Sequence, residues 1–189
     1  MTDPLAAVHW PVRTDRLSLR RASETDLDVI WAYRRDPAVT HWLSAAPTTI
    51  EQHRASFVER GGLAHMILVE LDGRVVGDAM IRIEDEWAQA EVADAARGKQ
   101  AELGWTVDPA YAGHGYATEA VGALVDLSFG PLGLRRVYAL CFSGNEPSWR
   151  LMERLGMRRE QHLVKESLHR SGEWLDAFGY ALLAEEWPR

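Results

Sequence analysis

The sequence predicts a mixed α/β fold, in which a β-sheet carries helices on both faces. Two apolar runs, 64–71 and 74–84, flank Asp72-Gly73, an arrangement typical of a β-hairpin with a two-residue turn. A strand, a glycine turn and a helix then follow one another over residues 102–129. Further on, the chain alternates again between strand and helix, as expected for a sheet covered by helices.

The first third of the chain carries two sequence signatures of helix N-termini. Ser23 and Thr48 are each followed three residues later by an acidic residue, which predicts a capping box. Glycine or proline then predicts where each helix ends. In chain order we expect a half-buried strand at 16–20, a helix from Ser23 to before Asp36-Pro37, a loop at 39–47 and a helix from Thr48 to Gly61-Gly62.

The rest of the chain follows the same logic. Residues 85–100 are acidic, rich in alanine and irregular, and we expect a mobile loop there. Asn145 is suited to an N-cap, Pro147 to a first helical turn and Gly156 to a helix end. The expected elements are a strand from Glu102, a helix at 116–129, a strand at 136–142, a helix after Asn145 and two strands joined near Ser171-Gly172.

Composition narrows the class of protein. At 189 residues the chain fits a single domain, which we assign to residues 1–189, and it has no apolar run of membrane-spanning length and no basic, apolar leader. We therefore expect a cytoplasmic protein. The single cysteine, Cys141, lies in an apolar run, so we interpret it as a packing residue. The net charge of −7 argues against non-specific nucleic-acid binding and favours a cationic partner such as an amine or a basic peptide.

Gly113 and Gly115 precede the helix at 116–129 and are the strongest functional signal in the sequence. Two glycines let the backbone approach a ligand closely, and the helix N-terminus offers unpaired N–H groups to an anion. A dinucleotide fingerprint requires a third glycine and a P-loop requires a Lys after the turn, and neither is present. The pattern therefore predicts either a plain tight turn or a diphosphate held by backbone amides.

Residues 112–117, Ala-Gly-His-Gly-Tyr-Ala, resemble the acyl-CoA-binding motif Gln/Arg-x-x-Gly-x-Gly/Ala of the Gcn5-related N-acetyltransferases (GNAT). The run Gly-Tyr-Ala-Thr-Glu-Ala resembles the RimJ/RimL-like branch, which acetylates ribosomal-protein N-termini. Asn145 to Met157 resembles the family's Asn-x-x-Ser helix ending in Leu-Gly-Phe/Met, and Gly172 to Trp187 its closing strand. One departure is Ala112, where the family has Gln or Arg, so a side-chain contact is lost at that position.

The resemblance implies a fold and a cosubstrate. The family's sheet is mostly antiparallel with about seven strands, and it splays between its fourth and fifth strands, here 102–107 and 136–142. The cosubstrate is acetyl-CoA, with the diphosphate on the backbone of the turn and the pantetheine along the strand before it. The implied cofactor-binding residues are Trp105, Thr106, Val107, Ala112, Gly113, His114, Gly115, Tyr116, Ala117, Thr118 and Asn145.

The resemblance also suggests a proton donor and a proton acceptor. Many relatives place a Tyr seven residues after the Asn, but here Met152 stands there and cannot donate a proton. Ser148 becomes the candidate general acid, against the alternative of a first-turn helix residue that bonds locally. Glu102 is the candidate general base, acting through a water, against the alternative of a surface carboxylate.

The expected reaction is acetyl transfer from acetyl-CoA to a primary amine, first of all a protein or peptide N-terminus. The alternatives are a small-molecule amine or aminoglycoside acceptor, another acyl donor such as succinyl-CoA, and a non-catalytic acyl-CoA sensor, which Ala112 and Met152 would suit. The seven histidines lack metal-binding spacing, so we expect no metal. A homodimer is compatible with the branch, but no apolar stripe in the sequence requires one.

Overall fold

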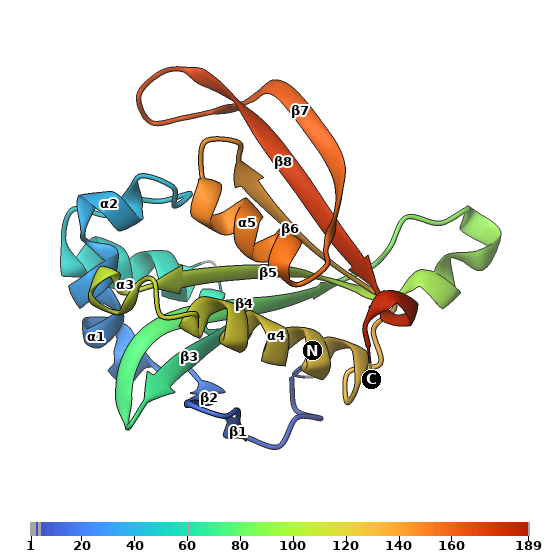
Figure 1. Cartoon of the computed structure of the whole chain (residues 1–189), viewed down its shortest axis with the longest axis horizontal. Coiled ribbons are helices and arrows are strands. Elements are labelled where there is room, and N and C mark those ends of the chain that lie inside the picture. The colour runs from blue at the N-terminus through green and yellow to red at the C-terminus, as the bar shows by residue number, and fades with distance from the viewer. Residues whose placement is uncertain (1–2, 4, 60, 189) are drawn as a thin grey trace. The chain divides into compact units, whose positions relative to one another are not determined.

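The computed structural model describes residue 3 and residues 5–59 and 61–188. Within these ranges the chain forms eight β-strands and five α-helices (Figure 1). Five of the described strand pairs are antiparallel, whereas β5 and β6 are parallel. The expected mixed α/β fold with a mostly antiparallel sheet is confirmed, with one strand more than the expected seven.

The chain divides into two compact units. The first contains the chain up to Ile81 together with 104–123, and the second contains 82–103 together with the chain from Leu124 onward. Strands β4 and β5 and helix α4 each pass from one unit into the other. The assignment of 1–189 to a single acetyltransferase domain stays a prediction.

The first unit contains an antiparallel arrangement in the order β1, β2, β3 and β4, which Figure 1 shows side by side. The turn between β3 and β4 places Asp72 at φ 49° and Gly73 at φ 77°, as the expected two-residue hairpin requires. The strands of this unit are β1 (Val12–Arg13), β2 (Leu17–Arg21), β3 (Met66–Leu71) and β4 (Arg74–Glu84).

Three helices belong to the first unit: α1 (Leu27–Arg34), α2 (Pro37–Thr40) and α3 (Ile50–Glu59). The Ser23 capping box forms as expected, with the Ser23 N–H donating to the Asp26 carboxylate at 2.9 Å. The buried face of α1 packs on β3 in a cluster made of Leu27, Ile30, Tyr33, Met66 and Leu68. This packing fixes α1, and with it the Tyr33 and Arg34 side chains.

The expected loop at 39–47 is wrong at its start, because Val39 and Thr40 complete α2. Pro37 occupies the first turn of this helix, where a missing N–H costs nothing. The Asp36 carboxylate accepts a hydrogen bond from the Ala38 N–H at 2.8 Å and caps the helix. Asp36-Pro37 therefore ends one helix and also begins the next.

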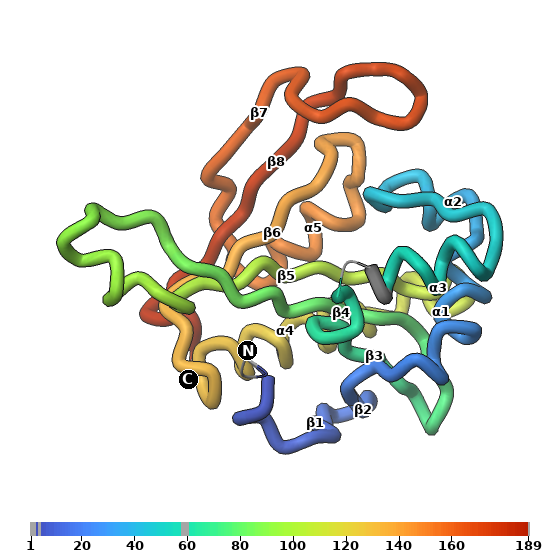
Figure 2. Tube along the Cα trace, turned by 180° about the vertical axis from the view of Figure 1, so that it is seen from behind, coloured from blue at the N-terminus to red at the C-terminus, as the bar shows by residue number. Residues whose placement is uncertain are grey.

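In the second unit the strand order is β5, β6, β8 and β7. The strands β7 (Arg158–Leu168) and β8 (Trp174–Leu183) form a long hairpin, visible in Figures 1 and 2. β5 (Gln100–Val107) pairs in parallel with β6 (Arg136–Phe142) through 100–102. The predicted splay beyond this pairing stays a prediction. The helices α4 (Tyr116–Phe129) and α5 (Glu146–Arg154) begin where the sequence indicates.

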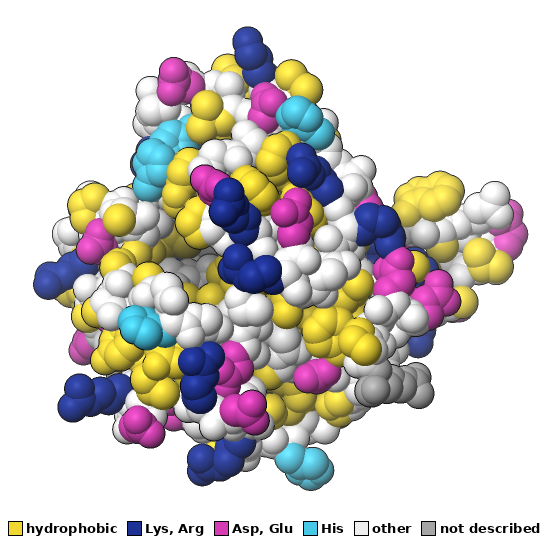
Figure 3. Space-filling view, in the orientation of Figure 1, with side chains coloured by type: hydrophobic (Ala, Val, Ile, Leu, Met, Phe, Trp, Pro, Cys, Tyr) yellow, Lys and Arg dark blue, Asp and Glu magenta, His cyan; other side chains and the backbone are white. Residues whose placement is uncertain are grey.

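The segment between β4 and β5 is more regular than expected, because Ala90–Ala96 forms a 3-10 helix. Its N-terminal side is held by the Glu86 N–H, which donates to the Ala96 carbonyl at 2.9 Å. The segment exposes Trp87, which is 89% accessible, and Val92. Figure 3 shows hydrophobic side chains on the surface of the projecting segment at the right of the view.

In the part of the chain that the structure describes, no helix is both long and apolar enough to cross a membrane. Across the same residues, no group of three or more His, Cys, Asp or Glu side chains is arranged to hold a metal ion. The cytoplasmic location and the homodimer stay predictions.

Candidate active site

The glycine turn follows directly from the end of β5. Asp108 caps a 3-10 turn, accepting a hydrogen bond from the Ala110 N–H at 2.9 Å, and the chain then enters Ala112 to Gly115. Gly113 and Gly115 both have φ near 80°, a conformation that other residues rarely adopt. A Cβ on Gly113 would meet no atom within 4 Å. The turn therefore presents open backbone just before the N-terminus of the 14-residue helix α4.

The structure brings the predicted diphosphate-binding residues together on this turn. Ala112, Gly113, His114 and Gly115 are exposed, and Tyr116, Ala117 and Thr118 are half-buried in the first turn of α4. The His114 ring stacks on the Tyr116 ring, with centroids 5.6 Å apart. Its Nδ1 lies 2.9 Å from the Ala112 carbonyl oxygen, so the imidazole also braces the turn.

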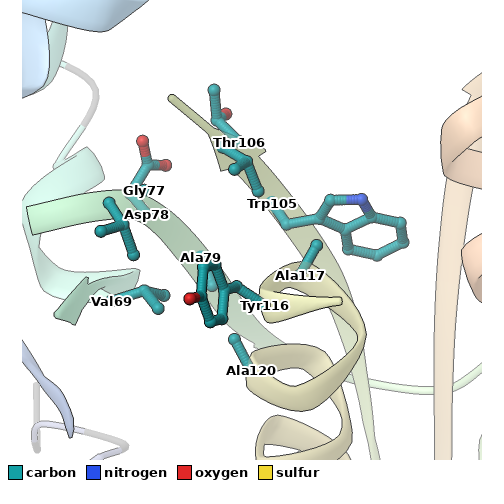
Figure 4. Close-up of a pocket in the computed structure, with 11 residues that line it drawn as sticks. Val69, Gly77, Asp78, Ala79, Trp105, Thr106, Tyr116, Ala117 and Ala120 are labelled. Carbon is teal, nitrogen blue, oxygen red and sulfur yellow. The ribbon is translucent and has the colours of Figure 1, made fainter. Parts of the chain in front are cut away.

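A small pocket lies beside the turn in the first unit (Figure 4). It is formed by β3, β4, the end of β5 and the start of α4. Figure 4 shows Tyr116 and Ala120 facing the pocket from α4, whereas the Trp105 indole extends to the other side of β5. The lining residues include the predicted Trp105, Thr106, Val107, Tyr116 and Ala117, together with Val69, Val76, Gly77, Asp78, Ala79 and Ala120.

The contact between β4 and β5 at this pocket depends on glycine. A Cβ on Gly77 would collide with the carbonyl oxygen of Thr106. The Val76 carbonyl also accepts a hydrogen bond from the Asp108 N–H at 3.0 Å. These contacts fix the backbone of Thr106 and Val107, whose polar groups are the ones predicted to face pantetheine.

A buried ion pair, Arg34–Asp78, contributes its Asp78 side to the lining of the pocket. The Asp78 carboxylate is 2% exposed and accepts hydrogen bonds from Arg34 at 2.5 and 2.9 Å and from the Tyr33 hydroxyl at 2.6 Å. Burial and the neighbouring Asp78 charge raise the pKa of Tyr33 well above its ordinary value, so this hydroxyl stays a donor. Arg34 also lies 3.3 Å from the Thr106 hydroxyl, which links helix α1 to β5.

The candidate base Glu102 lies on β5 in the second unit and is half-buried. It forms an ion pair with Arg82, which also pairs with Glu84 at 2.8 Å. The Tyr138 hydroxyl donates to Glu84 at 2.6 Å, and Tyr138 is the strand partner of Glu102 in β6. Burial raises the pKa of Glu102 and the nearby Glu84 adds to the rise, whereas Arg82 opposes it. The pKa of the Glu102 carboxyl group therefore lies above the ordinary value for a glutamate.

The candidate acid Ser148 lies in the first turn of α5, where its N–H donates to the Asn145 carbonyl at 3.1 Å. Asn145 is the N-cap residue, but its side chain makes no capping hydrogen bond. Met152 is completely buried, so it serves packing. Burial raises the pKa of Cys141 to about 11, which fits a packing residue. The role of Ser148 as general acid and the role of Asn145 in cofactor binding stay predictions.

Sequence reasoning missed three groups of polar residues beside these sites. Arg16 contacts the glycine turn, the Arg34–Asp78 pair lines the pocket through Asp78, and Glu84 and Tyr138 surround Glu102. The partners in these contacts lie 44 to 98 residues apart in the chain. No local pattern signals such a pairing. The isolated Asp78 within the otherwise apolar residues 75–81 is the available hint, because a buried carboxylate requires a partner.

Comparison with known proteins identifies relatives by sequence and by fold. The family model described as an acetyltransferase (GNAT) domain matches residues 16–158. An uncharacterised N-acetyltransferase of Bacillus subtilis, YnaD, is 30% identical over 93% of this chain and 98% of its own length. The crystal structure of a GNAT-family acetyltransferase from Bacillus anthracis is 32% identical, covers 93% of this chain and 99% of its own, and has a TM-score of 0.77.

Two more distant solved structures share the fold. RimJ of Mycobacterium smegmatis, in complex with CoA-disulfide, has a TM-score of 0.75 at 22% identity and covers 95% of this chain and 91% of its own. Spermidine N-acetyltransferase of Vibrio cholerae, in complex with CoA and spermine, has a TM-score of 0.75 at 20% identity and covers 92% of this chain and 98% of its own. At these identities the likeness concerns the fold alone.

Proposed function

The chain belongs to the GNAT family of acetyltransferases, and from this premise we propose that it transfers an acetyl group from acetyl-CoA to the N-terminal amine of a protein or peptide. The observation that carries the proposal is the glycine turn, with two glycines at φ near 80° before the α4 N-terminus and open space beside Gly113. The exposed turn fits a diphosphate, because backbone N–H groups and the helix dipole both favour an anion.

In the proposed reaction the amine nitrogen attacks the thioester carbonyl, the carbon–sulfur bond breaks, and a proton must reach the departing thiolate. Glu102 accepts the proton that the amine loses, through a water. Ser148 relays a proton to the thiolate, because its hydroxyl takes up a proton from solvent water as it gives up its own. Backbone N–H groups of Trp105 to Val107 polarise the carbonyl oxygen and stabilise the developing negative charge.

The environment of Glu102 supports an α-amine as the acceptor. A peptide α-amine has a pKa of about 7.7 to 8.0, so deprotonating it at pH 7 costs about 1 to 1.5 kcal/mol. A lysine-like amine with a pKa of about 10.4 costs about 4.6 kcal/mol. Burial raises the pKa of Glu102, while the Arg82 cation beside it opposes the rise. Such a base suits the easier deprotonation.

The test measures thiol release from acetyl-CoA with three acceptors: a peptide with a free N-terminus and no lysine, an N-formylated peptide with one internal lysine, and spermidine. We expect turnover with the first alone, and acetylation at its α-nitrogen by mass spectrometry. Turnover with spermidine alone would overturn the N-terminal assignment and favour a small-molecule acceptor. Binding of acetyl-CoA without turnover on any amine would favour the non-catalytic sensor.

The catalytic assignments need their own variants. We expect Glu102→Gln and Ser148→Ala each to lower kcat by about 100-fold, the typical size of an acid–base contribution, with little change in acetyl-CoA binding. Thr25→Ala, an exposed substitution in the first unit, serves as the matched control. If either catalytic variant keeps the unaltered kcat, that residue loses its assigned role. Repeating the assay with succinyl-CoA would identify a different acyl donor.

A further inference from the structure

Arg16 lies on the loop between β1 and β2, yet its side chain reaches the glycine turn. Its Nη1 donates to the carbonyl oxygen of His114 at 3.0 Å, and its Nε donates to Glu119 at 2.6 Å. The guanidinium also lies over the Tyr116 ring, 4.7 Å from the centroid. One planar side chain therefore touches the turn, the first turn of α4 and the aromatic ring between them.

Glu119 anchors this contact from the helix. Its carboxylate accepts hydrogen bonds from the Thr14 hydroxyl at 2.5 Å and from the Arg16 N–H at 2.9 Å, in addition to the Arg16 side chain. Although burial opposes ionisation, the hydrogen bonds from Thr14 and Arg16 hold the pKa of Glu119 below its ordinary value. Glu119 stays charged and holds Arg16 at two points, since one carboxylate oxygen bonds the guanidinium Nε and the other bonds the Arg16 backbone N–H.

The bond to the His114 carbonyl has a consequence for the next residue. In a trans peptide, the C=O of His114 and the N–H of Gly115 lie in one plane and point in opposite directions. Because the carbonyl faces Arg16, the Gly115 N–H faces away from it. Gly115 can adopt φ of either sign, so this peptide plane could otherwise turn over at little cost. Arg16 selects one of the two orientations.

We propose that Arg16 is a positioning residue for the diphosphate of the cosubstrate, because it orients the His114–Gly115 peptide so that the Gly115 N–H donates to the anion. This inference rests on the proposed function of the turn. The side chain that orients the turn comes from a distant segment of the chain. The turn itself, from Ala112 to Tyr116, carries only short or aromatic side chains.

Positioning and simple charge attraction predict opposite results for Glu119. If Arg16 acts only through its charge, Glu119→Gln removes an anion beside the site and tightens acetyl-CoA binding. If Arg16 orients the peptide, Glu119→Gln releases the guanidinium and weakens binding. Likewise, Arg16→Lys keeps the charge but cannot hold the carboxylate and the carbonyl with one planar fork.

The experiment is calorimetric titration of acetyl-CoA into the full chain. We expect Arg16→Ala to raise Kd by about tenfold or more, and Arg16→Lys and Glu119→Gln to raise it by several-fold. The double variant Arg16→Ala/Glu119→Gln should bind no more weakly than Arg16→Ala, because the two residues act as a unit. Arg13→Ala, which removes an exposed arginine on β1, is the control for net charge and should leave Kd unchanged.

Three further readouts locate the effect. Dephospho-CoA keeps the diphosphate, so the loss of affinity in Arg16→Ala should persist with it. S-acetyl-pantetheine lacks the diphosphate, so kcat/KM with this donor should be equal in the unaltered protein and in Arg16→Ala. In the ligand-free protein, the ¹⁵N–¹H signal of Gly115 should shift or broaden in Arg16→Ala as the peptide samples both orientations.

The outcomes separate this inference from the function on which it rests. If the unaltered protein fails to bind acetyl-CoA, the proposed function falls. If it binds, but Arg16→Lys binds equally well or Glu119→Gln binds more tightly, the positioning role is overturned and charge alone acts. Thermal melting of each variant shows whether it folds, and the two conservative variants keep the test decisive if Arg16→Ala does not.

Discussion

Glu102 shows how neighbouring charges set the strength of a base. Arg82 and Glu84 lie two residues apart on β4, so both side chains point to the same side of the strand. Arg82 lowers the pKa of Glu102, while burial and Glu84 raise it. A base works only when it is deprotonated, so kcat/KM should fall as the pH drops through this raised pKa.

The two neighbours should move this acidic limb in opposite directions. Arg82→Gln removes the charge that lowers the Glu102 pKa, so the limb should move to higher pH, by about one unit. Glu84→Gln removes a charge that raises it, so the limb should move to lower pH. The measurement is kcat/KM against pH with one peptide. Protonation of the peptide amine is common to all variants and cancels in the comparison.

The control for this series is Arg54→Gln, which breaks an exposed pair with Asp28 and should leave the limb in place. A shift in the same direction for Arg82→Gln and Glu84→Gln would contradict the assignment of the limb to Glu102.

His53 gives a residue-scale prediction about stability. It is 2% exposed, between the rings of Trp31 and Phe57, and burial together with the nearby Arg34 lowers its pKa to about 4, although Asp78 opposes this. Below pH 6.5 the unfolded chain binds a proton that the folded chain does not bind. Unfolding is therefore favoured by acid, and the free energy of unfolding should rise with pH between about 4 and 6.5.

His53→Phe removes this titration and keeps the aromatic packing. From pH 7.5 to pH 5 the unaltered protein should lose about 2 kcal/mol more stability than His53→Phe. Urea unfolding at the two pH values measures the difference. The exposed His9→Gln should keep the full pH dependence. Parallel stability profiles for His53→Phe and the unaltered protein would show that His53 is protonated in the folded state.

At the scale of elements, the Arg34–Asp78 pair joins α1 to the strands of the pocket. Asp78→Asn keeps the shape of the side chain but leaves the Arg34 charge with no anion inside the protein. A buried pair broken in this way costs about 3 to 5 kcal/mol, so we expect a loss of about 3 kcal/mol in the free energy of unfolding. Because Arg34 also contacts Thr106, the KM for acetyl-CoA should rise as well.

Asp28→Asn is the matched control, since its partner Arg54 lies at 2.7 Å but both side chains are more than half exposed. Screening by water leaves such a pair with little effect on stability, so the loss in Asp28→Asn should be much smaller than in Asp78→Asn. Equal losses in the two variants, measured by urea unfolding, would mean that the Asp78 pair has no special role in holding α1 to the strands.

At the scale of the whole molecule, local signals were enough to predict most elements. The bounds of α4 and β6 follow from a glycine turn and from apolar runs, each contained in a short window of sequence. Helix α2 was missed because Asp36-Pro37 both ends and begins a helix. Strand β1 was missed because two residues carry no period.

The polar contacts around the sites could not be predicted in the same way. The glycines of the turn can be recognised in the sequence, because glycine is the residue that readily adopts a positive φ. The contact of Arg16 with His114 depends on where a loop 98 residues away is folded. Arg16, Arg82 and Arg34 look like ordinary arginines in sequence, and only their partners distinguish them.

The net charge of −7 leads to a prediction for the whole molecule. An excess of acidic residues attracts cationic acceptors over distances of about a Debye length. Among peptides that share their first three residues, one with a basic tail should have a kcat/KM about tenfold above one with an acidic tail at 20 mM salt. The shared N-terminus keeps the chemistry at the amine the same, so the difference reports the approach of the peptide.

Salt distinguishes this long-range attraction from a specific contact. At about 0.5 M KCl the Debye length shrinks to a few ångströms, so the basic and acidic peptides should approach the same kcat/KM. A neutral peptide should change little across the series. If the preference for the basic peptide survives high salt, it comes from a desolvated ion pair near the acceptor, since burial protects such a pair from screening. The charge of the whole molecule would then have no part in choosing the acceptor.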